Sequence, residues 1–194
     1  ALPQDFNFVG EKSELIIGNN NVIRENVVIN RATHRGCKTV IGSDNFLMEG
    51  AHISHDTVVG DRCVFGYGAK IAGDCVIDTG AVISSNVVEK ANTRVGSYAV
   101  VQAGTTFSRD VPPYIIAGGS PVGFHGVNTT IQKSAGVEEK TLKHIANAYR
   151  LLFYGQTSVF DACIQIEQQV PSSTEISNII DFVRGTEVGI ISKL

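Results

Sequence analysis

The chain has 194 residues, a net charge of −3 and an apolar fraction of 43%, which suits one sizeable domain with a smaller appendage rather than several independent cores. Its charges are mixed in sign, so it lacks the basic surface of a nucleic-acid-binding protein. No apolar run approaches the ~20 residues needed to cross a membrane. The four cysteines show no CxxC spacing, and we expect them to be reduced core residues of a cytoplasmic protein.

Residues 1–16 are polar and partly aromatic, and we expect an irregular segment there. The chain starts at Ala1 without an initiator methionine, a basic region or a signal-like apolar stretch, so we expect it to be part of a longer product. No atypical capping repeat is recognisable before residue 17, where a regular pattern is already established.

From residue 17 to residue 107 an apolar side chain recurs at every sixth position, with Arg35 and Glu89 as exceptions. A second column, four residues after each of these positions, is mostly small, as at Ala51 and Cys75. A parallel β-helix produces such columns, because each coil places bulky and small side chains in a narrow interior. Three hexads make a coil of about eighteen residues, so we expect about five coils, with bulges or outward loops at Arg35 and Glu89.

The regular pattern ends at Pro112-Pro113, because two successive prolines cannot donate hydrogen bonds to a strand ladder. Apolar residues then recur at helical spacing, which predicts about three short helices. Two capping patterns, Ser158 with Asp161 and Ser172 with Glu175, predict the starts of the middle and last helices.

The chain is therefore predicted to be mainly β. Residues 1–126 would form the β-helix with its N-terminal loop and irregular exit, and residues 127–194 a small α-helical region.

The register also places the polar residues around His55. Because Ala51 and Ile53 occupy inward columns, His52, His55 and Asp56 must point outward or lie at a corner. A histidine in either place is either a candidate catalytic or binding residue or an ordinary surface residue.

Residues eighteen apart should stack on neighbouring coils, about 4.8 Å from each other. This rule places Gly73 above His55 and Cys37 below it. A glycine there leaves room for the imidazole and exposes a backbone N–H, as a general base beside an oxyanion donor requires. Asp74 would stack on Asp56, where the two carboxylates either share a proton or lie at a solvated corner.

The same rule stacks His52 on His34, a pair that could accept an anionic group such as phosphate. Zinc would need three protein ligands and an open position, and only His34 could join His52 and His55. We therefore expect no metal site. No nucleophile elbow or P-loop glycine pattern occurs, and direct acyl transfer would need no nucleophile such as Cys37.

Several motifs now identify a family by resemblance. They are Asn30-Arg31-Ala32-Thr33, Ala51-His52-Ile53-Ser54-His55-Asp56, Asp110-Val111-Pro112-Pro113-Tyr114 and Gly126-Val127-Asn128. In this order they closely resemble the acyl-[acyl-carrier-protein]:UDP-N-acetylglucosamine O-acyltransferases, which begin lipid A synthesis. The resemblance covers nearly the whole chain. Relative to the family, the first coils are missing from it. The resemblance implies a left-handed β-helix, against the usual handedness of crossovers, and a homotrimer with active sites between subunits.

The resemblance also implies roles for single residues. His55 would be the general base that takes the proton from the glucosamine 3-hydroxyl, Asp56 would orient it, and the Gly73 N–H would stabilise the oxyanion. The donor would be the phosphopantetheine thioester of acyl carrier protein, without a further cofactor.

Four positions are expected to contact substrate on the same ground. Asp5, His52 and Asn128 match positions that contact the nucleotide sugar, and Ala103 lies near the position that measures the acyl chain.

The chain departs from the family pattern at three places. Asp74 replaces a histidine, Lys90-Ala91 replaces a His-Gln pair, and Ser134-Ala135 replaces paired arginines. Asp74 and Lys90 remain candidate substrate-binding residues, and we expect Lys90 to supply the missing positive charge.

Three alternatives stay open at this point. The sister N-acyltransferase acts on a UDP-linked acyl-glucosamine and shares a similar catalytic element. A γ-type carbonic anhydrase would contain stoichiometric zinc. A catalytically weak or purely structural β-helix would not respond to nucleotide sugar.

Overall fold

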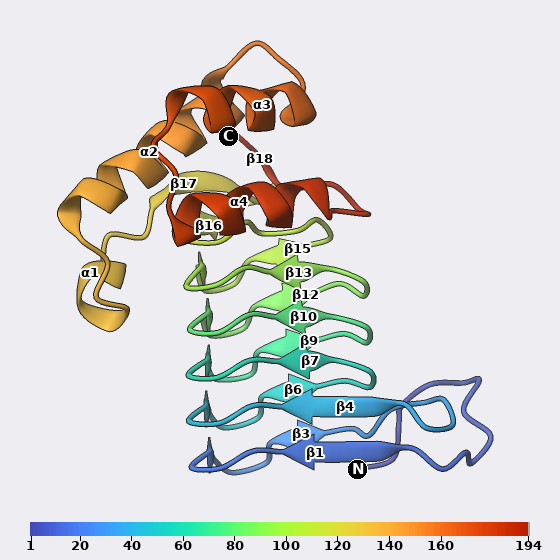
Figure 1. Ribbon diagram of the computed structural model, residues 1–194. Helices are drawn as coiled ribbons and strands as arrows, with labels where there is room; N and C mark the ends of the chain where they lie inside the picture. Colours follow the sequence, from blue (N-terminus) through green and yellow to red (C-terminus); the bar gives the residue numbers. More distant parts are fainter. Residues whose placement is uncertain (194) are drawn as a thin grey trace.

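The computed structural model describes residues 1–193 and has the architecture of a left-handed parallel β-helix with short helices at its C-terminal end (Figure 1). The strands form three sheets, one for each face of the column. The first face contains β1 (Glu14–Ile17), β4 (Lys38–Ile41), β7 (Val58–Val59), β10 (Val76–Ile77) and β13 (Arg94–Val95). The second contains β2 (Val22–Ile23), β5 (Phe46–Leu47), β8 (Val64–Phe65), β11 (Val82–Ile83), β14 (Val100–Val101), β16 (Ile115–Gly118), β17 (Gly123–Val127) and β18 (Ser192–Lys193). The third contains β3 (Val28–Ile29), β6 (His52–Ile53), β9 (Lys70–Ile71), β12 (Val88–Glu89) and β15 (Thr106–Phe107).

The first coil is one hexad longer than the coils that follow. Val28 pairs with His52 across it, whereas His52 pairs with Lys70 in the regular coils. The extra hexad forms an exposed loop that contains His34 and Arg35, so the outward loop expected at Arg35 is confirmed.

One expected stack is wrong for this reason, because the backbone partner of His52 in the coil below is Val28 rather than His34. The stack of His55 on Cys37 stays a prediction. Stacking at a separation of eighteen residues holds only from β4 onward.

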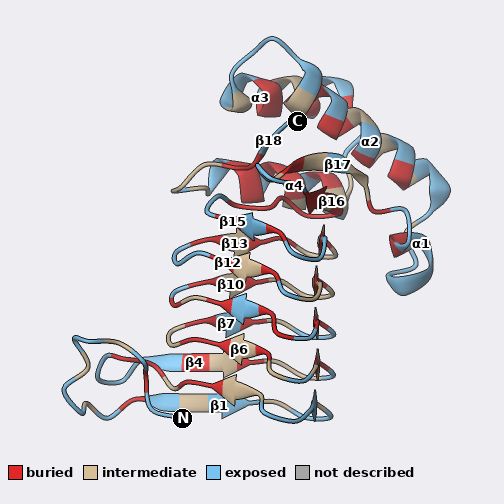
Figure 2. Cartoon of the chain, turned by 180° about the vertical axis from the view of Figure 1, so that it is seen from behind, coloured by how far each residue is buried: buried red, intermediate tan, exposed pale blue. Residues whose placement is uncertain are grey.

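From Ile29 onward the predicted apolar positions are buried in the column, whose coils show the buried colour in Figure 2. In the first coil the prediction is wrong for Ile17 and Ile23, which are 41% and 43% exposed. Leu47 and Phe65 are fully buried, and each such side chain stabilises the fold by about 1.5–3 kcal/mol. Cys63 and Cys75 are buried free thiols, as expected, but Cys37 is exposed because it leaves the extra loop.

The bulge or outward loop expected at Glu89 is also wrong. Glu89 lies in a regular strand and pairs in register with both neighbouring coils, so it marks neither a bulge nor a loop. Its side chain occupies the interior and is 1% exposed.

The regular register of eighteen residues ends near the two prolines, as predicted. Beyond them, β16 still pairs parallel with β14, with Val100 opposite Ile116, and also pairs antiparallel with β17. The helices are α1 (Ile131–Ser134), α2 (Glu139–Tyr154), α3 (Val159–Gln169) and α4 (Thr174–Arg184). The Ser158 cap of α3 is confirmed, because its side chain accepts a hydrogen bond from the Asp161 N–H. The last helix is capped by Ser173 rather than Ser172.

Buried polar contacts hold the helices on the column. Two nitrogens of the Arg94 guanidinium, Nε and Nη2, donate to Oδ2 of Asp110, and Nη2 also donates to the carbonyl of Phe182 at 2.8 Å. Asn178 of α4 donates to the hydroxyl of Tyr114 at 2.8 Å. The division of the chain at residue 126 stays a prediction, since β17 runs across that position.

Candidate active site

His55 lies at the corner that follows β6, outside the column. Its Nδ1 is 2.9 Å from Oδ2 of Asp56. Asp56 has a φ of +56°, a conformation that aspartate tolerates better than most residues. Thr33, from the extra loop, donates to the same oxygen through its N–H at 3.0 Å and its hydroxyl at 2.7 Å.

These contacts determine the protonation of the pair. Burial opposes ionisation of Asp56, but the hydrogen bonds from Thr33 and then from His55 outweigh it and lower the pKa of Asp56. The ionised carboxylate can only accept, so the contact needs a proton on Nδ1 of His55, and a neutral imidazole held in this way has its lone pair at Nε2. That nitrogen is 3.6 Å from Oδ2 of Asp5. The arrangement can therefore accept a proton from a nearby hydroxyl.

Gly73 lies against the imidazole, as the stacking rule predicts. A Cβ at this position would clash with Cε1 of His55 and lie 2.7 Å from Nε2. Glycine is thus required here by close approach of the ring. Gly73 is buried, and within residues 1–193 its N–H has no hydrogen-bond acceptor.

A cavity of about 110 Å³ opens beside His55. It brings together three of the predicted site residues, Asp5, His55 and Asp74. Burial and the charge of Asp56 raise the pKa of Asp74. The remaining lining residues are Asn7, Glu11, Thr33 and His34. His34 therefore reaches the site, although not through the expected stack.

A second cavity, of about 280 Å³, lies on the outer surface of the third face. His52 and Lys90 line it, together with Lys70, and its floor includes Ala72 and Val88. Burial, and then the neighbouring Lys70, lower the pKa of His52. An apolar floor beside two ammonium groups suits an amphiphilic anion.

Four predicted site residues line neither cavity. They are Asp56 and Gly73, which contact the imidazole of His55, and the predicted substrate-binding residues Ala103 and Asn128. Ala103 is exposed in the corner after β14. Asn128 is 4% exposed, and its amide already donates to the carbonyl of Tyr98 and accepts from Thr130. Their contacts with substrate stay predictions.

Sequence reasoning missed Thr33 and Lys70. Thr33 belongs to the extra loop, where the hexad register gives no stacking partner, so only its place in the Asn30-Arg31-Ala32-Thr33 motif could have drawn attention to it. Lys70 could have been found, because it lies eighteen residues after His52 and pairs with it in register.

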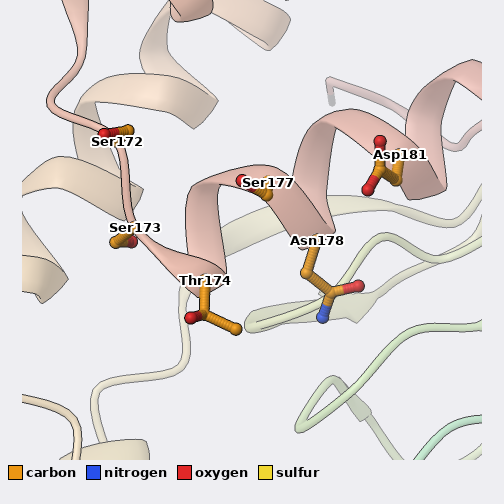
Figure 3. Close-up of a pocket in the computed structure, with 6 residues that line it drawn as sticks. All are labelled: Ser172, Ser173, Thr174, Ser177, Asn178 and Asp181. Atoms are coloured by element: carbon orange, nitrogen blue, oxygen red, sulfur yellow. The ribbon is translucent and has the colours of Figure 1, made fainter.

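A larger polar hollow, of about 590 Å³, lies at the start of α4. Short side chains line it, including Ser172 and Ser173 ahead of the helix and Ser177 and Asp181 on it (Figure 3). It holds no base comparable to His55.

No group of three or more His, Cys, Asp or Glu side chains within residues 1–193 is placed to hold a metal ion. In the same part of the chain, no helix is both long and apolar enough to cross a bilayer.

Comparison with known proteins adds independent observations. Residues 110–191 match the family described as Udp N-acetylglucosamine O-acyltransferase, domain 2, and residues 38–73 match the bacterial transferase hexapeptide family. The chain is 38% identical over 191 residues to an acyl-[acyl-carrier-protein]–UDP-N-acetylglucosamine O-acyltransferase from Syntrophobacter fumaroxidans, with 97% of this chain and 74% of the relative covered. An enzyme of the same name from Xylella fastidiosa is 35% identical, with 93% of this chain and 70% of the relative covered.

Solved structures agree with this similarity. The crystal structure of LpxA, a UDP-N-acetylglucosamine acyltransferase from Bacteroides fragilis, superimposes with a TM-score of 0.96 at 44% identity and covers 98% of this chain and 75% of that one. LpxA from Acinetobacter baumannii superimposes with a TM-score of 0.91 at 30% identity, over 98% of this chain and 74% of that one.

Proposed function

The chain belongs to the acyl-[acyl-carrier-protein]–UDP-N-acetylglucosamine O-acyltransferase family, and from this membership we propose a mechanism in which His55 is the general base. The reaction transfers a fatty acyl group from acyl carrier protein to the 3-hydroxyl of UDP-N-acetylglucosamine, the first step of lipid A synthesis. The observation that supports the mechanism best is the hydrogen bond of 2.9 Å between His55 Nδ1 and Asp56, because it leaves Nε2 free to accept a proton.

In the proposed transfer, the acceptor 3-hydroxyl lies near Nε2 of His55. As its oxygen attacks the thioester carbonyl, the proton moves to Nε2, and the resulting tetrahedral oxyanion accepts a hydrogen bond from the Gly73 N–H. The C–S bond then breaks, and the imidazolium returns the proton to the leaving sulfur. A new ester forms, a thiol is released, and neither a covalent acyl-enzyme nor a further cofactor is needed.

The two cavities suggest how the substrates divide the surface. Asp5 and Asp74, beside His55, would bind the hydroxyl-rich sugar by accepting hydrogen bonds. His52 and Lys90 line the second cavity, whose apolar floor suits the acyl chain and whose ammonium groups suit the anionic carrier. Ala103 would limit the length of the chain and Asn128 would contact the nucleotide from the exit region.

Assembly and location belong to the same proposal. We expect a homotrimer in the cytoplasm, with each active site completed by a neighbouring subunit. Multi-angle light scattering of the protein as it leaves a size-exclusion column measures the molar mass of the oligomer. A monomeric mass would contradict the trimer and the shared active sites.

The central experiment incubates the protein with a mixed pool of acyl carrier proteins and identifies the product by mass spectrometry. We expect an ester on UDP-N-acetylglucosamine. An amide formed on the 3-acylated UDP-glucosamine would instead identify the sister N-acyltransferase. Zinc in stoichiometric amount in the purified protein would favour a carbonic anhydrase. The absence of any product would identify the chain as a catalytically inactive relative.

A matched pair of variants tests the base. His55→Ala should lower kcat by about 10² to 10⁴ with little change in melting temperature, as expected for loss of a general base. The control is His125→Ala, since His125 is an exposed histidine outside both cavities. Near-normal turnover of His55→Ala would exclude the mechanism.

A further inference from the structure

The interior of the column contains one carboxyl side chain directly behind the wall of the second cavity. Glu89 lies in β12, and its in-register neighbours on the adjacent coils are Ile71 and Phe107. It is 1% exposed. A buried carboxyl destabilises a fold unless its polar atoms are hydrogen-bonded, so its hydrogen bonds decide what it does there.

The partner of Glu89 is Thr93, four residues later in the same coil. The Thr93 hydroxyl oxygen lies 2.9 Å from Oε1 of Glu89 and 2.7 Å from the carbonyl oxygen of Lys90. A hydroxyl has a single proton to donate, so it cannot donate to both oxygens. A carbonyl oxygen cannot donate, so the Thr93 hydroxyl donates to the Lys90 carbonyl, and in the other contact Glu89 must donate to Thr93.

Protonation of the carboxyl satisfies both contacts. Burial raises the pKa of Glu89 well above its ordinary value, which favours the neutral side chain, and the neutral carboxyl carries a hydroxyl of its own. The Glu89 O–H then donates to the Thr93 oxygen, and the Thr93 O–H donates to the Lys90 carbonyl. Placing the proton on Oε1 is preferred because Oε2 has no partner within the described residues, and a buried donor without an acceptor is costly.

A second interior group reaches the same carbonyl. The thiol of Cys75 lies 3.3 Å from the Lys90 carbonyl oxygen. Two donors from inside the column thus converge on the backbone of Lys90, whose side chain lines the second cavity on the outside. The interior therefore holds in place the corner from which this ammonium group extends.

We propose that Glu89, acting through the hydroxyl of Thr93, is a positioning residue that fixes the backbone of Lys90 and so the place of its ammonium group in the second cavity. The inference rests on the proposed function in one respect, since it takes Lys90 to bind the anionic acyl donor. The side chain of Glu89 acts from the interior, although the residue also lines the second cavity.

The test compares variants that keep or remove the interior donor. Glu89→Gln keeps it, because the amide N–H can donate to Thr93, whereas Glu89→Ile copies the residue in the coil below and removes it. Thr93→Val removes the relay. Thr105→Val is the matched control, since Thr105 is equally buried in the small column but has no contact with Lys90.

We expect Glu89→Ile and Thr93→Val to raise KM for acyl carrier protein by about three- to tenfold, the effect of one lost hydrogen bond, with kcat within about twofold. Glu89→Gln and Thr105→Val should stay within about twofold of the parent KM. Adding Lys90→Ala to Glu89→Ile should raise KM no further than Lys90→Ala alone, because both changes act through the same ammonium group.

A second readout needs no activity. Lysines labelled by reductive ¹³C-methylation give one NMR signal each, and Lys90→Arg assigns that of Lys90. We expect Glu89→Ile to move this signal and Glu89→Gln to leave it in place. An unmoved signal with unchanged KM, or equal effects of the Gln and Ile variants, would overturn the inference. A parent protein without transferase activity would refute the proposed function instead, and the NMR comparison would still decide the role of Glu89.

Discussion

The imidazole of His55 is hydrogen-bonded to the carboxylate of the very next residue, with 2.9 Å between Nδ1 and Oδ2 of Asp56. Neighbouring residues of an extended strand point to opposite faces, so this contact requires the corner and the positive φ of Asp56. Thr33 holds the carboxylate from the other side. The orientation of the proposed base thus depends on a turn and on a loop from the preceding coil.

Replacing Asp56 by Asn should lower kcat by at least about tenfold, because a neutral amide no longer holds the proton of His55 on Nδ1. The control is Asp44→Asn, which changes an aspartate in the same left-handed corner conformation (φ +60°) without a histidine beside it. Steady-state kinetics of both variants measure the difference. Equal activities would show that Asp56 does not orient the base.

Gly73→Ala should lower kcat to nearly the level of His55→Ala, because the added Cβ would have to displace the imidazole. The double variant should be no slower than His55→Ala alone, since both changes act through one ring. Melting temperatures of the single variants control for unfolding. If Gly73→Ala kept parental kcat, the ring would not occupy its observed place during turnover.

Lys90→Ala should raise KM for acyl carrier protein by about tenfold at low salt, and the difference from the parent should shrink as salt screens the charge. Lys38→Ala is the control, since Lys38 pairs only with exposed Glu14 on another face. Steady-state kinetics at two salt concentrations measure KM, and surface plasmon resonance under the same conditions measures the affinity for the carrier. Unaltered affinity for the carrier would contradict the role of Lys90.

Glu89 should make stability depend on pH. Its pKa is raised in the folded protein, so the folded state keeps a proton that the unfolded state releases above about pH 4.3. Stability is then fully present below that pH and is lost as the pH rises toward the folded pKa, by about 1.4 kcal/mol per unit. Glu89→Gln removes this dependence. Urea unfolding measures the free energy of unfolding of both proteins at pH 5 and pH 7. Between these pH values the stability of the variant relative to the parent should rise, and an unchanged difference would contradict a buried neutral carboxyl.

The hexad register was sufficient to predict the architecture, because side chains such as Leu47 and Phe65 can only be buried together in a narrow column. It also predicted that Gly73 lies against His55. It could not reveal the extra loop, because an insertion of one whole hexad leaves the phase of every later residue unchanged. Only Arg35 marked it, and the stack of His52 on His34 failed accordingly.

Glu89 shows the limit of the same reasoning. A polar residue in an apolar column means either that the chain loops outward, as at Arg35, or that a polar group is buried with partners, as at Glu89. The register cannot distinguish the two, because the answer depends on whether Thr93 and Cys75 can supply hydrogen bonds. Thr33 was missed for a similar reason, since its contact with Asp56 crosses between coils out of phase.

The long first coil also has a consequence for how such a surface can diversify. Because a whole hexad can be added at a corner without disturbing the packing above it, gene duplications or deletions of that length would resize the cavity beside His55 while the column stays folded. The loop that carries Thr33 and His34 is thus the part of this enzyme most open to evolutionary or engineered change in the acceptor it admits.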